Sequence, residues 1–131
     1  MLKLLNKFMP KKKKAKILIV EDEQALRRHY DMVLSSDYEL DFAQTGKQGL
    51  EKAQNIPDLI MLDINLPEIS GVEILKHLKK DEKTADIPVL VLTNLSDEET
   101  VSKIIKAGGK DYMVKADWSV EDIAKKIQEL I

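Results

Sequence analysis

Short apolar runs alternate along the chain with segments in which apolar residues recur at helical spacing. A run of about 4–8 apolar or alternating residues is typical of a strand, whereas apolar residues spaced three and four apart are typical of a helix. The runs predict strands at 16–20, 38–43, 58–62, 87–92 and 111–114. The other segments predict helices at 24–36, 47–54 and 72–80, one that ends near 107–109 and one that follows Ser119. Strands and helices that alternate in this way predict an α/β fold, a parallel sheet covered by helices on both faces.

Two of the runs also indicate where their strands lie in the sheet. Residues 38–43 alternate between apolar and charged side chains, as expected for a strand with one exposed face. Residues 87–92 are apolar throughout, which is typical of a strand buried on both faces.

Residues with capping side chains mark where some helices begin or end. Ser96 has Glu99 three residues later, the pattern of a capping box, and Ser119 is expected to cap the last helix. The sequence 55–57 contains Asn and Pro and predicts the end of the helix at 47–54.

Charge is distributed unevenly between the first residues and the rest of the chain. The 131 residues carry 21 basic and 23 acidic side chains. Seven of the basic side chains lie within residues 1–16 with no acid among them, which leaves 14 basic against all 23 acidic residues for the rest. We expect a basic tail at 1–15 and one folded domain at 16–131. The acidic domain is a poor surface for nucleic acid, because contacts to phosphate supply most of that affinity.

The basic tail at 1–15 has two interpretations. It is either disordered or a short amphipathic helix, and in the second case it could contact a membrane surface. It lacks the features of a secretory signal, and no stretch is apolar enough to span a membrane. The chain has no cysteine, which fits a cytoplasmic location.

Polar residues with distinct chemistry follow the strands of the predicted sheet. Glu21 and Asp22 follow the first strand, Asp63 the third, Thr93 the fourth and Lys115 the fifth. Ligands bind at the carboxyl ends of strands in open parallel sheets. Carboxylates close together repel one another unless a cation lies among them, and oxygen ligands without His or Cys favour Mg²⁺. The sequence therefore predicts a magnesium and phosphate site at this edge, with a carboxylate as the nucleophile.

In these residues the chain resembles the receiver domain of the two-component response-regulator family. The resemblance covers residues 16–131, and it extends to Tyr112, three residues before Lys115, at the position of the family's aromatic switch. It implies a flavodoxin-like, doubly wound fold of five parallel strands and five helices. It also implies a cytoplasmic phosphoprotein of phosphorelay signal transduction, here of the stand-alone, single-domain type.

The resemblance also implies a role for each residue of the site. Asp63 would accept a phosphoryl group from a histidine kinase or a histidine phosphotransfer protein. Asp22, Asp63 and the backbone carbonyl of Asn65 would bind Mg²⁺, with Glu21 acting through water. A second set would bind the phosphoryl group and change position in response to it: Thr93, Lys115 and Tyr112. The signal would pass to the face formed by the fourth helix, the fifth strand and the fifth helix.

Two residues depart from the family pattern. Ala116 follows Lys115 where the family usually has a proline, often after a cis peptide bond; a cis bond before a residue other than proline costs about 3–4 kcal/mol. Asn94 follows Thr93 where the family generally has a small residue, and we expect it to narrow access and to slow hydrolysis of the phosphoryl group.

Other functions remain open alternatives. A receiver-like module that binds partners without phosphorylation is one. A haloacid-dehalogenase-type phosphatase is less favoured, because Asn65 stands where that family has its second aspartate, and a flavodoxin-like electron carrier lacks a suitable phosphate loop. We expect no conventional enzyme, only assistance with the domain's own phosphorylation and dephosphorylation. We expect a monomer or a weak dimer that depends on phosphorylation; the kinase and the downstream protein are not determined.

Overall fold

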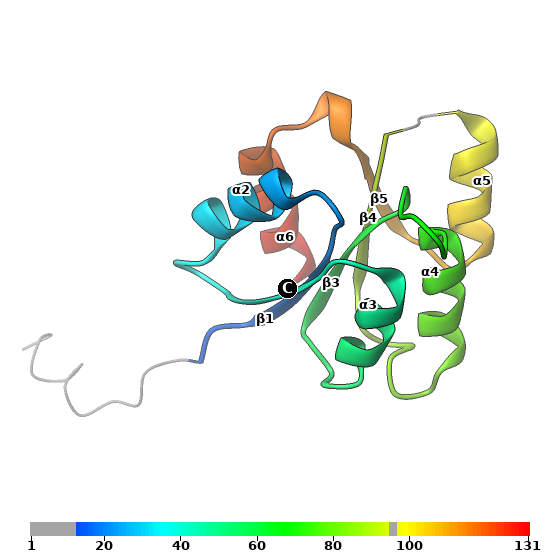
Figure 1. Cartoon of the computed structure of the whole chain (residues 1–131), viewed down its shortest axis with the longest axis horizontal. Helices are drawn as coiled ribbons and strands as arrows, with labels where there is room; N and C mark the ends of the chain where they lie inside the picture. The colour runs from blue at the N-terminus through cyan, green and yellow to red at the C-terminus, as the bar shows by residue number, and fades with distance from the viewer. Residues whose placement is uncertain (1–12, 95–96) are drawn as a thin grey trace, which may run out of the picture.

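The computed structural model describes residues 13–94 and 97–131, and within them five strands form one parallel sheet (Figure 1). The strands are β1 (Lys16–Val20), β2 (Glu39–Ala43), β3 (Leu59–Asp63), β4 (Val89–Thr93) and β5 (Asp111–Val114). Their order across the sheet is β2-β1-β3-β4-β5. The order reverses between β1 and β3, and ligands bind at such a reversal in open α/β sheets.

Helices cover both faces of the sheet, as the sequence predicts. They are α2 (Gln24–Leu34), α3 (Gly46–Ala53), α4 (Gly71–Lys80), α5 (Glu98–Lys106) and α6 (Val120–Leu130). One buried cluster joins α3, α4 and α5 to one face, and a second joins α2 and α6 to the other. In Figure 1, α3, α4 and α5 lie on one side of the sheet, and α2 and α6 lie on the opposite side. The predicted flavodoxin-like fold of three layers is confirmed.

The observed elements differ from the predicted ones mainly at their ends. The exposed face predicted for β2 is confirmed, and the strand lies at the edge of the sheet; every residue of β4 is buried, as predicted. Ser119 caps α6, as expected, and it forms a capping box with Asp122. The other predicted cap, Ser96, lies outside the described residues; the N-cap of α5 is Asp97, whose side chain accepts a hydrogen bond from the Thr100 N–H.

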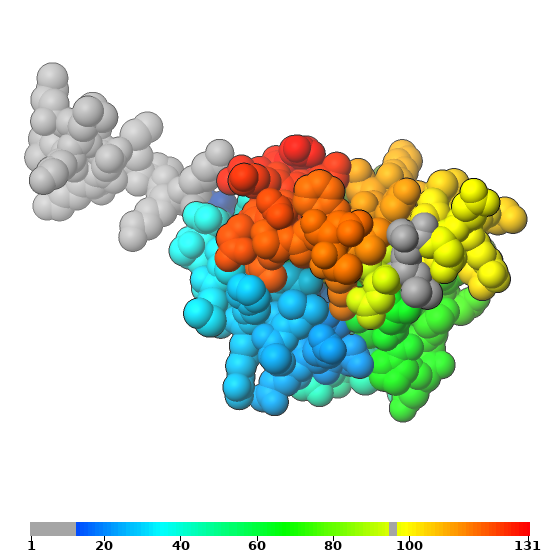
Figure 2. Space-filling view, turned by 90° about the horizontal axis from the view of Figure 1, so that it is seen from above, coloured from blue at the N-terminus to red at the C-terminus, as the bar shows by residue number. Residues whose placement is uncertain are grey.

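The strands end together at one edge of the sheet because their registers are nearly aligned. Val20 pairs with Leu62, and Thr93, the last residue of β4, pairs with Val114, the last of β5. Residues that follow these strands therefore meet, although they come from distant parts of the sequence. Seen from above this edge, the segment after β5 (orange) lies between α2 (blue) and α5 (yellow) (Figure 2).

Gly71, the first residue of α4, allows this helix to start directly against the end of β3. Its N–H donates to the carbonyl of Ile64 at 3.1 Å. A Cβ at this position would lie 2.4 Å from the Ile64 Cα and 2.5 Å from the Asp63 carbonyl oxygen. Backbone atoms cannot move away as a flexible side chain can, so the path of the chain after Asp63 depends on this glycine.

We expect Gly71→Ala to destabilise the fold by about 1–3 kcal/mol, because the added methyl group overlaps backbone. Gly46→Ala is a matched control, since Gly46 is also the first residue of its helix. There the added Cβ would lie 2.7 Å from Ile74 Cδ1, the mobile end of a side chain. Urea unfolding should give a clearly lower midpoint for Gly71→Ala than for Gly46→Ala. Equal midpoints for the two variants would contradict the role given to Gly71.

Candidate functional site

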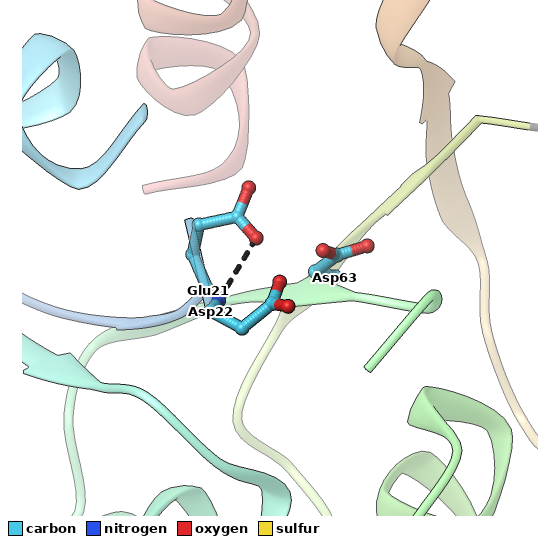
Figure 3. A group of neighbouring side chains, drawn as sticks. All are labelled: Glu21, Asp22 and Asp63. Carbon is cyan, nitrogen blue, oxygen red and sulfur yellow. Dashed lines mark hydrogen bonds between the residues drawn. The ribbon is translucent and has the colours of Figure 1, made fainter. Parts of the chain in front are cut away.

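Three carboxylates gather at the carboxyl edge of the sheet (Figure 3). Glu21 and Asp22 follow β1, and Asp63 is the last residue of β3; one oxygen from each lies within 4.8 Å of the others. Glu21 and Asp63 are almost completely buried, with 1% and 3% of their surface exposed, whereas Asp22 is exposed. Two acids are thus withdrawn from water and the third faces it.

Lys115 places its ammonium group between the two buried acids. Its Nζ lies 2.8 Å from Glu21 Oε1 and 3.1 Å from Asp63 Oδ2. The side chain is itself mostly buried, with 16% exposed. Such charge-assisted bonds are strong because little water competes for either partner. The lysine therefore holds both carboxylates in place.

The electrostatic environment favours a proton on Glu21 and a charge on Lys115. Burial raises the pKa of Glu21, hydrogen bonding with Asp63 raises it further, and Lys115 only partly offsets them, so that the pKa is about 8. Burial works against the charge of Lys115, but the hydrogen bond to Glu21 and the charges of Asp63 and Glu21 outweigh it and raise the pKa of the lysine. The site has more negative charge than one ammonium group can neutralise.

Backbone donors orient the same carboxylates. The Asn65 N–H donates to Asp63 Oδ1 at 2.9 Å, and the Asp22 N–H donates to Glu21 Oε2 at 3.1 Å. In each buried acid, one carboxylate oxygen thus accepts a hydrogen bond from a backbone N–H and the other contacts the Lys115 ammonium group. The Asp63 carboxylate is fixed at both oxygens, with its orientation set before any ligand arrives.

The structure brings together most of the residues that the sequence singles out. Glu21, Asp22, Asp63 and Lys115 form one cluster. Thr93 is completely buried at the end of β4, the strand next to β3. Tyr112 lies on β5 and is 40% exposed, so its side chain points outward rather than into the site.

The loop after β5 differs from one expectation for the family. The described residues contain no cis peptide bond, so Lys115 precedes Ala116 in the trans form. Lys115–Asp117 instead form a short 3₁₀ helix that the sequence pattern does not predict. The lysine still reaches both acids from this turn.

Two contacts and one buried hydroxyl near the site were not foreseen from the sequence. The Asn94 N–H donates to Asn65 Oδ1 at 3.1 Å and joins the loops that follow β3 and β4. Arg27 Nη1 donates to the Glu21 carbonyl at 2.8 Å. Tyr30 is buried on α2 and has a hydroxyl without a described partner. Helical spacing predicts which face of α2 is buried, but it does not predict whether a polar atom on that face has a hydrogen-bond partner.

Comparison with known proteins identifies the family. The model of the response regulator receiver domain matches residues 17–128. The chain belongs to this family. The receiver domain predicted from the sequence is thereby confirmed, and the match supports a phosphoacceptor role in two-component signalling.

Receiver domains with similar sequences occur in proteins of different kinds. The domain is 38% identical over 118 residues to the response regulator ArlR of Staphylococcus saprophyticus, covering 88% of this chain and 52% of that protein. It is 34% identical over 128 residues to the histidine kinase P4 of Formosa agariphila, covering 97% of this chain and 9% of that kinase. The chain thus spans about half the length of the response regulator it matches, and a small part of the kinase.

Solved structures share the fold over nearly the whole domain. The chemotaxis response regulator CheY4 of Vibrio cholerae superimposes with a TM-score of 0.82 at 28% identity, covering 90% of this chain and 99% of that chain. A receiver domain described as beryllofluoride-activated DrrB superimposes with a TM-score of 0.79 at 27% identity, covering 89% and 97%. In the described part of the present chain, no helix is both long and apolar enough to cross a membrane.

The donor atoms in the receiver site suit a hard cation. Glu21, Asp22 and Asp63 offer only carboxylate oxygens, which Mg²⁺ prefers over nitrogen or sulfur. Asp22 is exposed and gives access from solvent, while the two buried acids lie behind it. The excess negative charge of the cluster favours a cation in the same place.

Glu21 should make the stability of the metal-free domain depend on pH. Its pKa is raised from 4.5 to about 8, so the folded state holds the proton more tightly than the unfolded state. The resulting stabilisation is complete below pH 4.5 and is lost as the pH rises through 8. In EDTA we expect the free energy of unfolding to fall across this range by on the order of a few kcal/mol.

Urea unfolding at a series of pH values measures this effect. Glu21→Gln should flatten most of the decline, because its amide does not titrate. Glu23→Gln, at an exposed position two residues away, should leave the decline as it is. A decline of the same size in Glu21→Gln would show that another group is responsible.

Proposed function

We propose that Asp63 is the phosphoacceptor of this receiver domain and that Lys115 is the cation that prepares it. The observation that carries the proposal is the position of the Lys115 ammonium between Glu21 and Asp63, 3.1 Å from the Asp63 carboxylate. A carboxylate held by a lysine and a backbone N–H at the end of a buried strand is oriented for attack.

The donor is a phosphohistidine on a histidine kinase or a histidine phosphotransfer protein. A carboxylate oxygen of Asp63 attacks phosphorus in line with the bond that breaks. A P–O bond forms, the P–N bond to the imidazole breaks, and its electron pair leaves with the imidazole nitrogen. The products are an aspartyl phosphate and a free histidine, and no water is consumed until the aspartyl phosphate is hydrolysed.

Magnesium is the cofactor that the donor set supports. Asp22, Asp63 and the backbone carbonyl of Asn65 would bind it, with Glu21 acting through water. When bound, the ion supplies positive charge that lowers the repulsion between the acids and an incoming phosphoryl group.

Two further residues are assigned to the phosphoryl group itself. The Lys115 ammonium would pair with one phosphoryl oxygen, and the Thr93 hydroxyl would donate to another. Thr93 ends β4, the strand next to β3, and Lys115 follows β5, which lies on the far side of β4.

The change at Thr93 and Lys115 would reach the surface through β5. Tyr112, exposed on β5, would turn inward, and the face formed by α5, β5 and α6 would change in shape. This is a shift between two states, and it requires contacts that differ between the free and the phosphorylated site. That face would then bind a downstream protein or a second copy of the domain.

The remaining predictions from the sequence fit this function as proposals. Residues 16–131 would act as the receiver, with 1–15 as a basic tail of which 1–12 lie outside the described residues. A cytoplasmic location follows from a histidine kinase as phosphoryl donor. The domain would assist its own phosphorylation and dephosphorylation without being a conventional enzyme.

Intact mass after incubation with Mg²⁺ and acetyl phosphate tests the proposal. The unaltered chain should gain the mass of one phosphoryl group, and Asp63→Asn should gain none. Asp58→Asn is the matched control: it makes the same change just before the other end of β3, at an exposed position. It should be phosphorylated like the unaltered chain.

The function would be overturned if the unaltered chain gained no phosphoryl group from acetyl phosphate or from a phosphohistidine donor. The chain would then be a receiver-like binding module. Steady hydrolysis of phosphate esters, which Asp63→Asn abolishes, would instead indicate a phosphatase.

A further inference from the structure

Tyr30 carries a buried hydroxyl that takes no part in the interactions described above. The residue lies in the middle of α2 and is 1% exposed. Its hydroxyl has no hydrogen-bond partner, the only buried side-chain polar atom of this kind among the described residues. A hydroxyl without a partner is costly in a protein interior, whereas phenylalanine would fill the same space without that cost. The hydroxyl therefore calls for a role in another state of the domain.

Strand alternation places Tyr30 on the same side of the sheet as the site. Tyr30 packs in the cluster that contains Ile19 of β1 and Met61 of β3. Side chains two residues apart in a strand share a face, so Glu21 and Asp63 belong to this face as well. The Glu21 N–H bonds to the Ala43 carbonyl at 2.9 Å, which continues the strand ladder through Glu21.

The direction of α2 brings the hydroxyl toward the acids. The helix starts at Gln24, just after the carboxyl end of β1, and runs back along the sheet. Side chains of a helix lean toward its N-terminus, so the ring of Tyr30 leans toward the edge where Glu21 lies. After burial, the charges of Glu21 and Asp63 are the next causes that raise the pKa of Tyr30, which agrees with this direction.

Phosphorylation would leave Glu21 in need of a new donor. In the unphosphorylated domain Glu21 Oε1 accepts from Lys115 at 2.8 Å. If Lys115 turns to a phosphoryl oxygen, that carboxylate oxygen loses its donor in a buried place, which is unfavourable unless another donor replaces it. The Tyr30 hydroxyl is a buried donor on the same face that has no other described partner.

We propose that Tyr30 is a positioning residue of the phosphorylated state, whose hydroxyl donates to the Glu21 carboxylate once Lys115 has turned to the phosphoryl group. The inference rests on the proposed function, because it requires the movement of Lys115. It adds a residue from the interior of α2 to a site otherwise built from strand ends. It also explains why a hydroxyl without a partner is kept in the unphosphorylated core.

The test compares Tyr30→Phe with the unaltered chain in two states. Beryllofluoride with saturating Mg²⁺ serves as the phosphoryl mimic, and an NMR titration gives its dissociation constant. Removal of one buried donor should weaken binding of the mimic by about three- to ten-fold. The urea midpoint without the mimic should stay the same or rise, because the substitution also removes an unsatisfied polar atom.

Tyr38→Phe is the matched control. Tyr38 packs partly against the same cluster, but just before β2, at the opposite edge of the sheet from the site. This substitution also removes one hydroxyl, but it should leave the affinity for beryllofluoride unchanged.

A second measurement leaves Tyr30 intact. The chain has three tyrosines, so Tyr38→Phe and Tyr112→Phe assign the Tyr30 signal in a domain labelled with ¹³C at the tyrosine Cζ. This signal should shift when beryllofluoride binds, because the hydroxyl gains an acceptor.

The outcomes separate this inference from the function beneath it. Three results would each overturn the inference. The affinity of Tyr30→Phe for beryllofluoride could be unchanged, or the Tyr30 signal could stay in place when beryllofluoride binds. The third is a free energy of unfolding that Tyr30→Phe lowers equally with and without beryllofluoride. The phosphoacceptor role would stand in these cases as long as the unaltered chain is phosphorylated on Asp63. If the unaltered chain takes up neither a phosphoryl group nor beryllofluoride, the function fails, and the inference fails with it.

Discussion

The burial of two carboxylates beside one ammonium group is the constraint on which this domain depends. Glu21 and Asp63 are nearly inaccessible to water, and Lys115 is the cation that contacts both. One positive charge does not neutralise two negative ones, and the raised pKa of Glu21 expresses that imbalance. A proton and a metal ion are two ways to supply the missing positive charge. The site is therefore sensitive to whatever brings charge to it.

The fold matters to this constraint because it joins residues that are far apart in the chain. Lys115 and Glu21 are separated by 94 positions, and only the parallel order of β1, β3, β4 and β5 brings them together. The contact costs chain entropy to form, and the two hydrophobic layers provide the compensating stability. Gly71 also helps to place the site, because it lets α4 begin in contact with the backbone of Asp63 and Ile64.

Periodicity and residue order predicted the fold and the meeting of three acids and Lys115 at one edge of the sheet, because both follow from where each strand begins and ends. An apolar run ending in Asp63 indicates a strand end, and parallel strands must end at one edge. The specific partners were not predictable in this way. Nothing in the sequence says that Lys115 bonds Glu21 as well as Asp63, or that the Asn94 N–H reaches the side chain of Asn65. Such contacts depend on the exact path of a loop, which residue order does not give. The same holds for the N-cap of α5, which is Asp97.

The arrangement of donors around the buried acids explains how a small chemical change can be felt beyond the site. Each carboxylate oxygen of Glu21 and Asp63 has a donor in the unphosphorylated domain, so none of these donors is free to bind another acceptor. An added phosphoryl group brings new acceptors without new donors, and the donors must be redistributed. Lys115 is the donor that two acids already share, and it extends from the turn that leads into α6. In the proposed function, competition for this one ammonium group would link the chemistry at Asp63 to the position of β5 and of α6, the helix that follows it.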